Sequence, residues 1–389
     1  MQHAKRLDLI PPYLFGEIAR LKKQAISEGR DLVDLGIGDP DQPTPPPIID
    51  ALYEAAKDPE THRYDESAAG DPEFLNAAAR WFERRFGVTL DPASEMLLLI
   101  GSKEGLAHLC WAYVDAGDVT LVQDPAYTVP RVNTLLAGGT PHPMPLTAAN
   151  RFLPDLTAIP SDVARAAKVM FLNYPHNPTG AVATPEFFQE AVAFAREYDI
   201  LICHDCAYSE VCYDDYRAPS ILQTPGAKDV AIEMHSLSKT FNMTGWRVGF
   251  AVGNPDAIKT LNRLKGNIDS KQFMAVTHAA GWAMNHVNND CTLALYQKRR
   301  DILVDGLNAL GWNIEKPKAA FYIWVPVPPE YTSMSFATAL LEAGVLAIPG
   351  VGYGAHGDGY VRMALTLADK NGERVEEAVR RIGQMNIRW

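Results

Sequence analysis

Between residues 96 and 252 the chain alternates short, mostly apolar runs with longer amphipathic segments. The apolar runs are MLLLI (96–100), VTLVQ (119–123), KVMFLN (168–173), ILICHD (200–205), VAIEMHS (230–236) and RVGFAV (247–252). Runs of this length and composition are typical of strands buried on both faces of a sheet, and the segments between them are typical of crossover helices. The alternation predicts an α/β fold with a mostly parallel sheet covered by helices on both faces.

Two helices in or near this region have clear start signals. Asp71 followed by Pro72 predicts a helix from about residue 73 to 85, because aspartate caps a helix and proline suits its first turn. Thr184 followed by Pro185 predicts a second helix, and its apolar residues fall on one face. These residues are Phe187, Phe188, Ala191, Val192 and Ala195.

The chain on either side of this region lacks the regular alternation of apolar runs and amphipathic segments. An amphipathic helix within residues 14–29, a short strand at DLVDLGIGDP and a proline-rich loop from Gly36 to Pro47 predict an N-terminal arm, residues 1–45. A long helix near 289–311, the strands FYIWVPV, VLAIPG and YVRMALT, a helix near 335–343 and a final helix predict a small α+β domain, residues 286–389. The arm is expected to join this small domain, and residues 46–285 form the large one.

Composition excludes several classes of partner. The net charge is −11, which argues against nucleic acid or an anionic membrane as the main partner. No apolar run reaches the roughly 18 residues of a membrane span, and the N-terminus lacks the apolar core of a secretion signal. Five scattered cysteines fit a reduced, cytoplasmic protein. Cys203 and Cys206 lack a second pair at zinc-site spacing, so we interpret them as core residues and predict no metal.

Polar residues follow most of the predicted strands. In a parallel sheet the carboxyl ends of the strands lie along one edge, where ligands bind. We therefore expect these polar side chains to gather at one edge of the sheet. They are Ser102 and Lys103, Tyr127, Asn177, Asp205 and Lys239.

Lys239 lies between two predicted buried strands, preceded by Ser236 and followed eight residues later by Arg247. Burial and a nearby cation lower the pKa of a lysine and make its amine a nucleophile toward carbonyl groups. Serine hydroxyls and an arginine suit a phosphate. An amine nucleophile beside a phosphate site indicates pyridoxal phosphate. A Ser-Lys pair alone would also suit a solvated turn, but the shared edge favours the functional interpretation.

The other polar residues each suit one part of pyridoxal phosphate. A carboxylate such as Asp205 can keep the ring nitrogen protonated, although an aspartate after a strand also commonly caps a turn. Asn177 and Tyr208 can donate to the phenolic oxygen. Tyr127 can stack on the ring or simply pack. The backbone of GSKEG, at a predicted helix N-terminus, can bind the phosphate, and its spacing excludes a nucleotide P-loop.

One glycine motif does not fit a nucleotide site. Residues Gly352 to Gly357 match GxGxxG, but a predicted strand follows them where a dinucleotide site needs a helix. Arg362 in that strand suits the carboxylate of a substrate, and a surface ion pair remains an equal alternative at this point.

The chain resembles the class I/II aminotransferases of fold type I over nearly its whole length. The stretches LGIGDP, RYDESAAG, GSKEG, DPAY, NYPHNPTG, DCAYSE, SLSK, GWRVG and GYVRMAL occur in the order of that family. The resemblance implies a large domain with a seven-stranded type of sheet, pyridoxal phosphate as cofactor, and ping-pong transfer of an amino group to 2-oxoglutarate. HSLSKTFNMTGWRVGFAVGN and YRAPSILQTPGAKDV are most similar to the branch that uses LL-diaminopimelate.

The resemblance also implies roles for individual residues. Lys239, Asp205 and Tyr208 are expected to be catalytic, with Lys239 bound to the cofactor. It further implies a homodimer in which each subunit contributes to its neighbour's site. The implied phosphate ligands are Ser102, Lys103, Ser236 and Arg247; the ring partners are Asp205, Asn177, Tyr208 and Tyr127; the substrate-carboxylate ligands are Arg362, Gly38 and Asn177; and the residues donated across the interface are Tyr64 and Asn267.

Two positions depart from the family pattern. Ser67 stands where plant members of the branch carry a glutamate, and Lys271 stands where glycine is expected. Asp65 and Glu66 are then the nearby acceptors for a distal ammonium group. Three alternatives to an LL-diaminopimelate aminotransferase remain: a transaminase for aspartate, alanine or aromatic amino acids, a C–S lyase on the same fold, and a non-enzymatic regulator, for which the N-terminal arm leaves little room.

Overall fold

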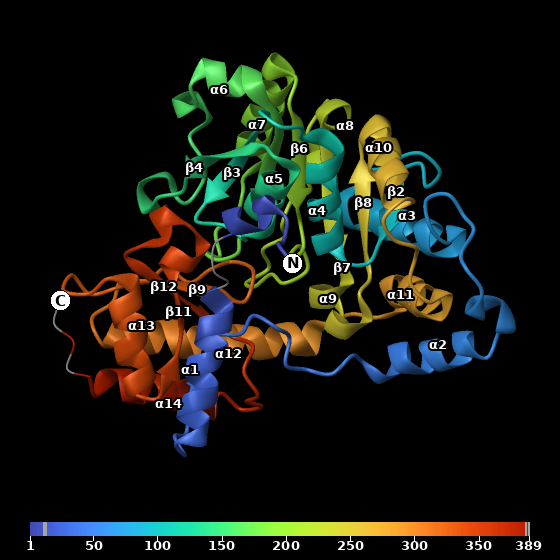
Figure 1. Cartoon of the computed structure of the whole chain (residues 1–389). Coiled ribbons are helices and arrows are strands. Elements are labelled where there is room, and N and C mark those ends of the chain that lie inside the picture. The colour runs from blue at the N-terminus through green and yellow to red at the C-terminus, as the bar shows by residue number, and fades with distance from the viewer. Residues whose placement is uncertain (11–13, 386, 388–389) are drawn as a thin grey trace.

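A seven-stranded sheet forms the centre of the computed structural model, which describes residues 1–10, 14–385 and 387 (Figure 1). Its spatial order is β2-β8-β7-β6-β5-β3-β4, and all strands except β8 run parallel. The predicted α/β class and mostly parallel sheet are confirmed. The strands are β2 (Met96–Leu99), β3 (Val119–Asp124), β4 (Thr140–Pro145), β5 (Ala167–Asn173), β6 (Leu201–Asp205), β7 (Ala231–Ser236) and β8 (Gly249–Gly253).

Helices cover both faces of this sheet because neighbouring side chains of a strand point to opposite faces. Met96 and Leu98 of β2 belong to a core shared with α3, α7 and α11, whereas Leu97 and Leu99 belong to a core shared with α4, α5 and α10. The helices are α3 (Pro72–Phe86), α4 (Ser102–Tyr113), α5 (Val129–Ala137), α6 (Ser161–Ala166), α7 (Pro185–Tyr198), α8 (Ala227–Val230), α9 (Leu237–Thr240), α10 (Pro255–Lys265) and α11 (Met274–His286).

Proline explains two elements of this part that were not predicted, β4 and α2. The sequence TPHPMP forms β4 at the edge of the sheet, where proline is tolerated because only one side of the strand pairs. The proline-rich loop expected to reach Pro47 ends earlier, because Pro46 and Pro47 begin α2 (Pro46–Ala56). The sequence alone does not distinguish a proline in the first turn of a helix or in an edge strand from a proline in a loop.

The C-terminal part has its own three-stranded sheet, of order β11-β12-β9, with β11 (Ile348–Pro349), β12 (Tyr360–Ala364) and β9 (Tyr322–Pro326). The stretch VLAIPG, expected to be one strand, is divided between β10 (Val345–Leu346) and β11. The N-terminal strand β1 (Val33–Asp34) pairs with β10, and Val33 and Leu35 pack in the same core. The helices are α1 (Leu14–Ser27), α12 (Asp290–Ala309), α13 (Ser333–Glu342) and α14 (Glu373–Gly383).

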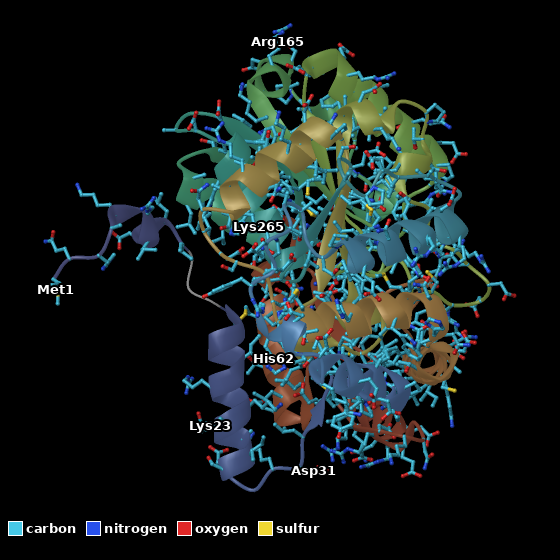
Figure 2. The ribbon with its side chains drawn as sticks, turned by 90° about the vertical axis from the view of Figure 1, so that its right-hand side faces the viewer. Met1, Lys23, Asp31, His62, Arg165 and Lys265 are labelled. Atoms are coloured by element: carbon cyan, nitrogen blue, oxygen red, sulfur yellow. The ribbon has the colours of Figure 1, made fainter. Side chains whose placement is uncertain are left out.

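The arm therefore meets the C-terminal part: besides β1, Ile18 of α1 packs against Trp324 and Ile348 of the three-stranded sheet, and Figure 1 shows α1 in front of α12 in that view. In the view of Figure 2, Lys23 and Asp31 lie at the opposite end of the molecule from Arg165. The boundaries at residues 45 and 285 remain a proposal. Among the described residues, no helix is long and apolar enough to cross a membrane.

Both predicted helix starts agree with the structure. The Asp71 side chain accepts from the backbone N–H of Glu73, with Pro72 in the first turn. The Thr184 side chain accepts from the N–H of Phe187 at 3.2 Å. All five residues predicted for the inner face of α7 are buried.

We expect Thr184→Ala to lower the stability of the protein by about 1 kcal/mol, because the N–H that Thr184 now satisfies loses its acceptor. Thr184→Ser keeps the hydroxyl and is the matched control. Thermal unfolding followed by circular dichroism measures both variants. Equal midpoints for the two variants would show that the cap contributes nothing.

Candidate active site

A cleft of about 540 Å³ lies at the carboxyl edge of the large sheet. β2, β3, β5, β6 and β7 all end at this edge, and the antiparallel β8 begins there. The cleft collects nearly every residue that the sequence singled out. Those that line it are Gly38, Ser102, Lys103, Tyr127, Asn177, Asp205, Tyr208, Ser236, Lys239, Arg247 and Arg362.

Lys239 lies on α9, the short helix that follows β7. Its Nζ donates to the backbone oxygen of Gly38 at 3.4 Å. Burial lowers the pKa of Lys239 to about 8, Asp39 opposes this shift, and Arg247 reinforces it. A far larger share of this amine than of an ordinary lysine is therefore unprotonated near neutral pH, where it can act as a nucleophile or a base.

Asp205 ends β6 and is 8% exposed. Burial raises its pKa to about 6, whereas His204 and the backbone N–H of Ala207 lower it. Its Oδ1 atom is buried and has no hydrogen-bond partner within the described chain. A buried carboxylate oxygen without a donor costs free energy, so this atom marks the place where a ligand with a positive N–H group would be stabilised.

The opposite end of the cleft gathers hydrogen-bond donors. The 12-residue helix α4 begins here at Ser102, and its first backbone N–H groups have no partner within the helix. The Nη1 atom of Arg247 donates to Ser238 Oγ at 3.4 Å. Gly101 has φ +81°, and a Cβ there would collide with the Arg247 guanidinium. The glycine lets the cation approach the N-terminus of α4, and an anion would be stabilised between them.

Tyr208 and Arg362 connect the large sheet to the C-terminal sheet. The hydroxyl groups of Tyr208 and Tyr322 are 2.9 Å apart, and burial raises the pKa of Tyr208 well above its ordinary value. Arg362 is 3% exposed, so the surface ion-pair alternative is wrong. It donates to Asn177 Oδ1 at 3.1 Å and to the backbone oxygen of Gly36 at 2.7 Å.

The chemistry of these groups fits pyridoxal phosphate. The free oxygen of Asp205 matches a protonated ring nitrogen, and the lysine of lowered pKa matches the aldehyde. The N-terminus of α4, with Arg247 over Gly101, matches the phosphate. These three groups lie around one cleft of sufficient size for the cofactor.

Several residues of the cleft were not predicted. Asp39 opposes the loss of the proton from Lys239, and Tyr322 and Tyr353 lie against the Arg362 guanidinium, 4.3 and 5.1 Å from it. Asp39 stands within the quoted stretch LGIGDP, so position could have identified it. Nothing in FYIWVPV distinguishes Tyr322 from an ordinary strand residue. Asn173 also lines the cleft.

Tyr64 and Asn267 do not line the cleft of their own chain. Tyr64 is 83% exposed, and Asn267 is exposed beyond the end of α10. The two departures from the family pattern, however, contact each other. Lys271 Nζ donates to the backbone oxygen of Ser67 and lies 3.6 Å from the Asp65 carboxylate. The Asp65 Oδ1 atom accepts from Ser67, and its buried Oδ2 atom faces Lys271, so the Asp65 carboxylate is turned away from solvent, whereas Glu66 is exposed.

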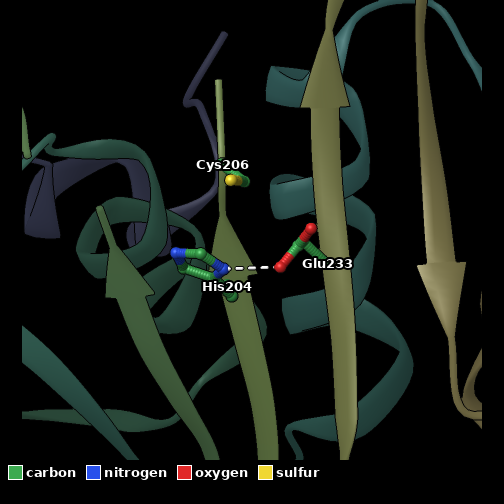
Figure 3. A group of neighbouring side chains, drawn as sticks. All are labelled: His204, Cys206 and Glu233. Carbon is green, nitrogen blue, oxygen red and sulfur yellow. Dashed lines mark hydrogen bonds and ion pairs between the residues drawn. The ribbon is translucent and has the colours of Figure 1, made fainter. Parts of the chain in front are cut away.

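A second group of polar side chains lies within the sheet, between β6 and β7. Figure 3 shows His204, Cys206 and Glu233 close enough to share a metal ion. Yet the Glu233 carboxylate already accepts from His204, His235, the Ser220 hydroxyl and the Ile221 backbone. His204 Nε2 faces the backbone oxygen of Tyr174 at 3.0 Å. We interpret this cluster as a saturated hydrogen-bond network that ties β6 to β7.

The unpartnered oxygen of Asp205 leads to a prediction for protein prepared without cofactor. The pKa of Asp205 is about 6 in the folded chain and ordinarily 3.8, so its ionisation destabilises the fold progressively from pH 4 to above pH 6, by up to about 3 kcal/mol. Asp205→Asn removes that cost. We expect the variant to unfold at a higher temperature than the wild type at pH 8, and with no advantage at pH 4.

Loading with pyridoxal phosphate should reverse the order at pH 8, because the ring nitrogen then needs the carboxylate. Thermal midpoints and the fraction of cofactor retained after dialysis measure both states. The exposed Glu190→Gln is the control for loss of one charge. A wild type at least as stable as Asp205→Asn in cofactor-free protein at pH 8 would contradict the prediction.

Comparison with known proteins agrees with this chemistry. Residues 30–382 match the family described as "Aminotransferase class I and II". The LL-diaminopimelate aminotransferase of Moorella thermoacetica is 56% identical over 98% of both chains, and LL-diaminopimelate aminotransferase 2 of Nostoc sp. is 54% identical over the whole of both. The apo-BacF structure from Bacillus subtilis superposes with a TM-score of 0.94 at 36% identity, covering 100% of this chain and 99% of that one. The chain belongs to the class I and II aminotransferases, a family of pyridoxal-phosphate-dependent enzymes.

Proposed function

We propose that this aminotransferase transfers an amino group from LL-diaminopimelate to 2-oxoglutarate. The placement of Lys239 and Asp205 in one cleft supports the reaction. The names of relatives that are 47–56% identical over nearly their full length support the donor. A C–S lyase and transaminases for other amino acids share the fold and are the alternatives that an assay must separate.

The reaction assigns distinct tasks to the residues of the cleft. Pyridoxal phosphate, when bound, withdraws electrons from the substrate α-carbon and makes its C–H bond acidic. Lys239 would hold the cofactor until the substrate amine replaces it, and its freed Nζ would then serve as the group that accepts the α-proton and gives it up again. A pKa near 8 suits a base that must accept and release a proton at neutral pH.

The surrounding residues bind and orient the cofactor. Asp205 would hold the proton on the ring nitrogen, and Asn177 and Tyr208 would donate to the phenolic oxygen. Tyr127 would stack on the ring. Ser102, Lys103, Ser236 and Arg247, all of which line the cleft, would bind the phosphate.

Arg362 binds the α-carboxylate of the substrate, together with Asn177 and the backbone of Gly38. The guanidinium lies between the rings of Tyr322 and Tyr353, which exclude water and fix its plane. A Cβ at residue 38 would collide with the Tyr322 hydroxyl, so only glycine allows this approach. A planar, buried guanidinium favours bidentate binding of a carboxylate.

We further propose that the enzyme is a homodimer and that Tyr64 and Asn267 complete the partner's site. Large apolar side chains are exposed on α2 and on two loops that meet where the rings of His62 and Phe273 are 5.6 Å apart. Such a surface is typical of a protein interface. The exposed residues are Ile49, Tyr53, Tyr64, Ile268 and Phe273.

The loop that carries Asn267 is firmly anchored to its own subunit. Lys265 is 3% exposed, and its Nζ donates to Glu104 at 2.9 Å and to Asp269 at 2.6 Å. Glu104 lies in the first turn of α4, at the phosphate end of the cleft. The same helix therefore supports the proposed phosphate site of one subunit and the loop offered to the other.

A cytoplasmic location is the compartment that we propose. All five cysteines are free, and Cys110, Cys203 and Cys206 are buried. Burial raises the pKa of the Cys110 thiol to about 12, so it is unreactive. Buried free thiols fit a reducing compartment.

The donor can be tested with a panel of amino acids. We expect LL-diaminopimelate to give glutamate from 2-oxoglutarate faster than aspartate, alanine or aromatic amino acids do. Because Glu66 is exposed beside Tyr64 whereas Asp65 is bound to Lys271, Glu66→Gln should raise the KM for LL-diaminopimelate more than that for alanine. Asp65→Asn, the matched variant, should affect both donors alike. Brisk turnover of another donor, with none of LL-diaminopimelate, would disprove the assignment.

Mixed dimers test whether sites are shared between subunits. Lys239→Ala alone should abolish turnover, because the proton then has no acceptor, and Tyr64→Ala alone should lower it. In a dimer of one chain of each kind, one site keeps both residues if Tyr64 acts across the interface. We expect turnover well above that of either parent after mixing and refolding. Failure to recover activity would place Tyr64 in its own subunit's site.

A further inference from the structure

The glycine motif that failed as a nucleotide site has a different role in the structure. Residues Gly352–Gly357 lie in a loop built of two short 3-10 helices, Gly350–Tyr353 and Ala355–Gly357, just before β12. The loop carries Tyr353, whose ring faces the Arg362 guanidinium. It belongs to the C-terminal sheet in sequence, yet it reaches the large sheet at the end of β3.

Three hydrogen bonds hold the loop there. Asp124, the last residue of β3, accepts from the backbone N–H of His356 at 3.2 Å and lies 3.0 Å from His356 Nδ1. The backbone N–H of Ala126 donates to the oxygen of Tyr353 at 2.9 Å. We call these three hydrogen bonds the latch.

Glycine at position 354 makes the latch possible. Its φ is +143°, and a Cβ at this position would overlap the Asp124 carboxylate. The Asp124 side chain is 8% exposed, so its charge is largely shielded from water. A shielded carboxylate bound by two donors of one residue is a stronger anchor than a surface ion pair.

The latch joins the two halves of the proposed site. Residues 124–126 precede Tyr127, the residue that we propose stacks on the cofactor. The loop that they hold presents Tyr353 to Arg362, the residue that we propose binds the substrate carboxylate. A neighbouring cavity of about 760 Å³ is lined by Asp124, Tyr127, Tyr353 and His356, so the latch also forms one wall beside the cleft.

We propose that Asp124 and His356 are positioning residues that hold Tyr353 against Arg362 and so preorganise the substrate-carboxylate site. This inference rests on the proposed role of Arg362 and not on the identity of the amino donor. Neither Asp124 nor His356 acts on the reacting atoms. Release of the loop should weaken substrate binding and leave the chemical step largely intact.

The experiment uses the cofactor-loaded enzyme and the amino acid that the wild type uses best, whichever that is. We expect His356→Ala to raise the KM for that donor about tenfold and to change kcat less than threefold, as suits loss of a charge-assisted hydrogen bond. Gly354→Ala should act in the same direction, because its Cβ displaces the carboxylate.

Gly359→Ala is the matched control. Gly359 also has a positive φ, +87°, and lies between the loop and β12, but a Cβ there meets no atom within 4 Å. It shares the backbone strain of Gly354→Ala without touching the latch. Its KM should stay near that of the wild type.

Hydrogen exchange gives a readout that does not depend on substrate. The amides of Ala126 and His356 should exchange faster in His356→Ala and Gly354→Ala than in the wild type and Gly359→Ala. Asp124→Ala combined with His356→Ala should be no worse than Asp124→Ala alone, because Asp124→Ala already removes both hydrogen bonds between the two residues. An unchanged KM in both loop variants, an equal rise in Gly359→Ala, or a loss confined to kcat would each overturn the proposal.

Discussion

The parallel pairing of β3, β5, β6 and β7 is the constraint on which the rest of the structure depends. Parallel strands bring their carboxyl ends to one edge, and the residues that follow them arrive there whatever their separation in sequence. Asp205 and Lys239 are 34 residues apart along the chain, yet both line one cleft. The helices on the two faces then bury the strands, and the cleft lies at their carboxyl edge.

A buried edge of this kind carries unsatisfied polar groups. Asp205 keeps a bare oxygen, and Lys239 has lost part of its affinity for its proton. Both groups cost free energy when the cleft is empty. Both become favourable when a ligand brings a positively charged N–H group to Asp205 and a carbonyl carbon to Lys239. The C-terminal part completes the enclosure through Tyr322 and Arg362, so the site needs both sheets although only one supplies the proposed cofactor ligands.

The sequence predicted the large sheet well because its strands are apolar throughout and their exits are polar. The prediction failed for β4 and α2, because proline occurs in edge strands and first helical turns as well as in loops. It also failed for β10 and β11, because a two-residue strand is too short to show alternating apolar residues. For the site, residues at strand ends could be found by position. Tyr322 and Tyr353 could not, because an aromatic residue that packs and one that lines a cleft look the same in sequence. The pairing of Lys271 with Ser67 was equally hidden, since 204 residues separate them.

The antiparallel β8 has a consequence for how the chain can change in length. Ser236 at the end of β7 pairs with Gly249 at the start of β8, so residues 237–248 form a closed connection between two fixed points. Lys239 and Arg247 both lie inside it. Inserting or deleting one residue after Arg247 would force β8 to slip in register and turn its side chains to the opposite faces of the sheet. A change before Arg247 would instead move the guanidinium away from Gly101. The segment between Lys239 and Arg247 therefore tolerates substitutions but not a change in its number of residues.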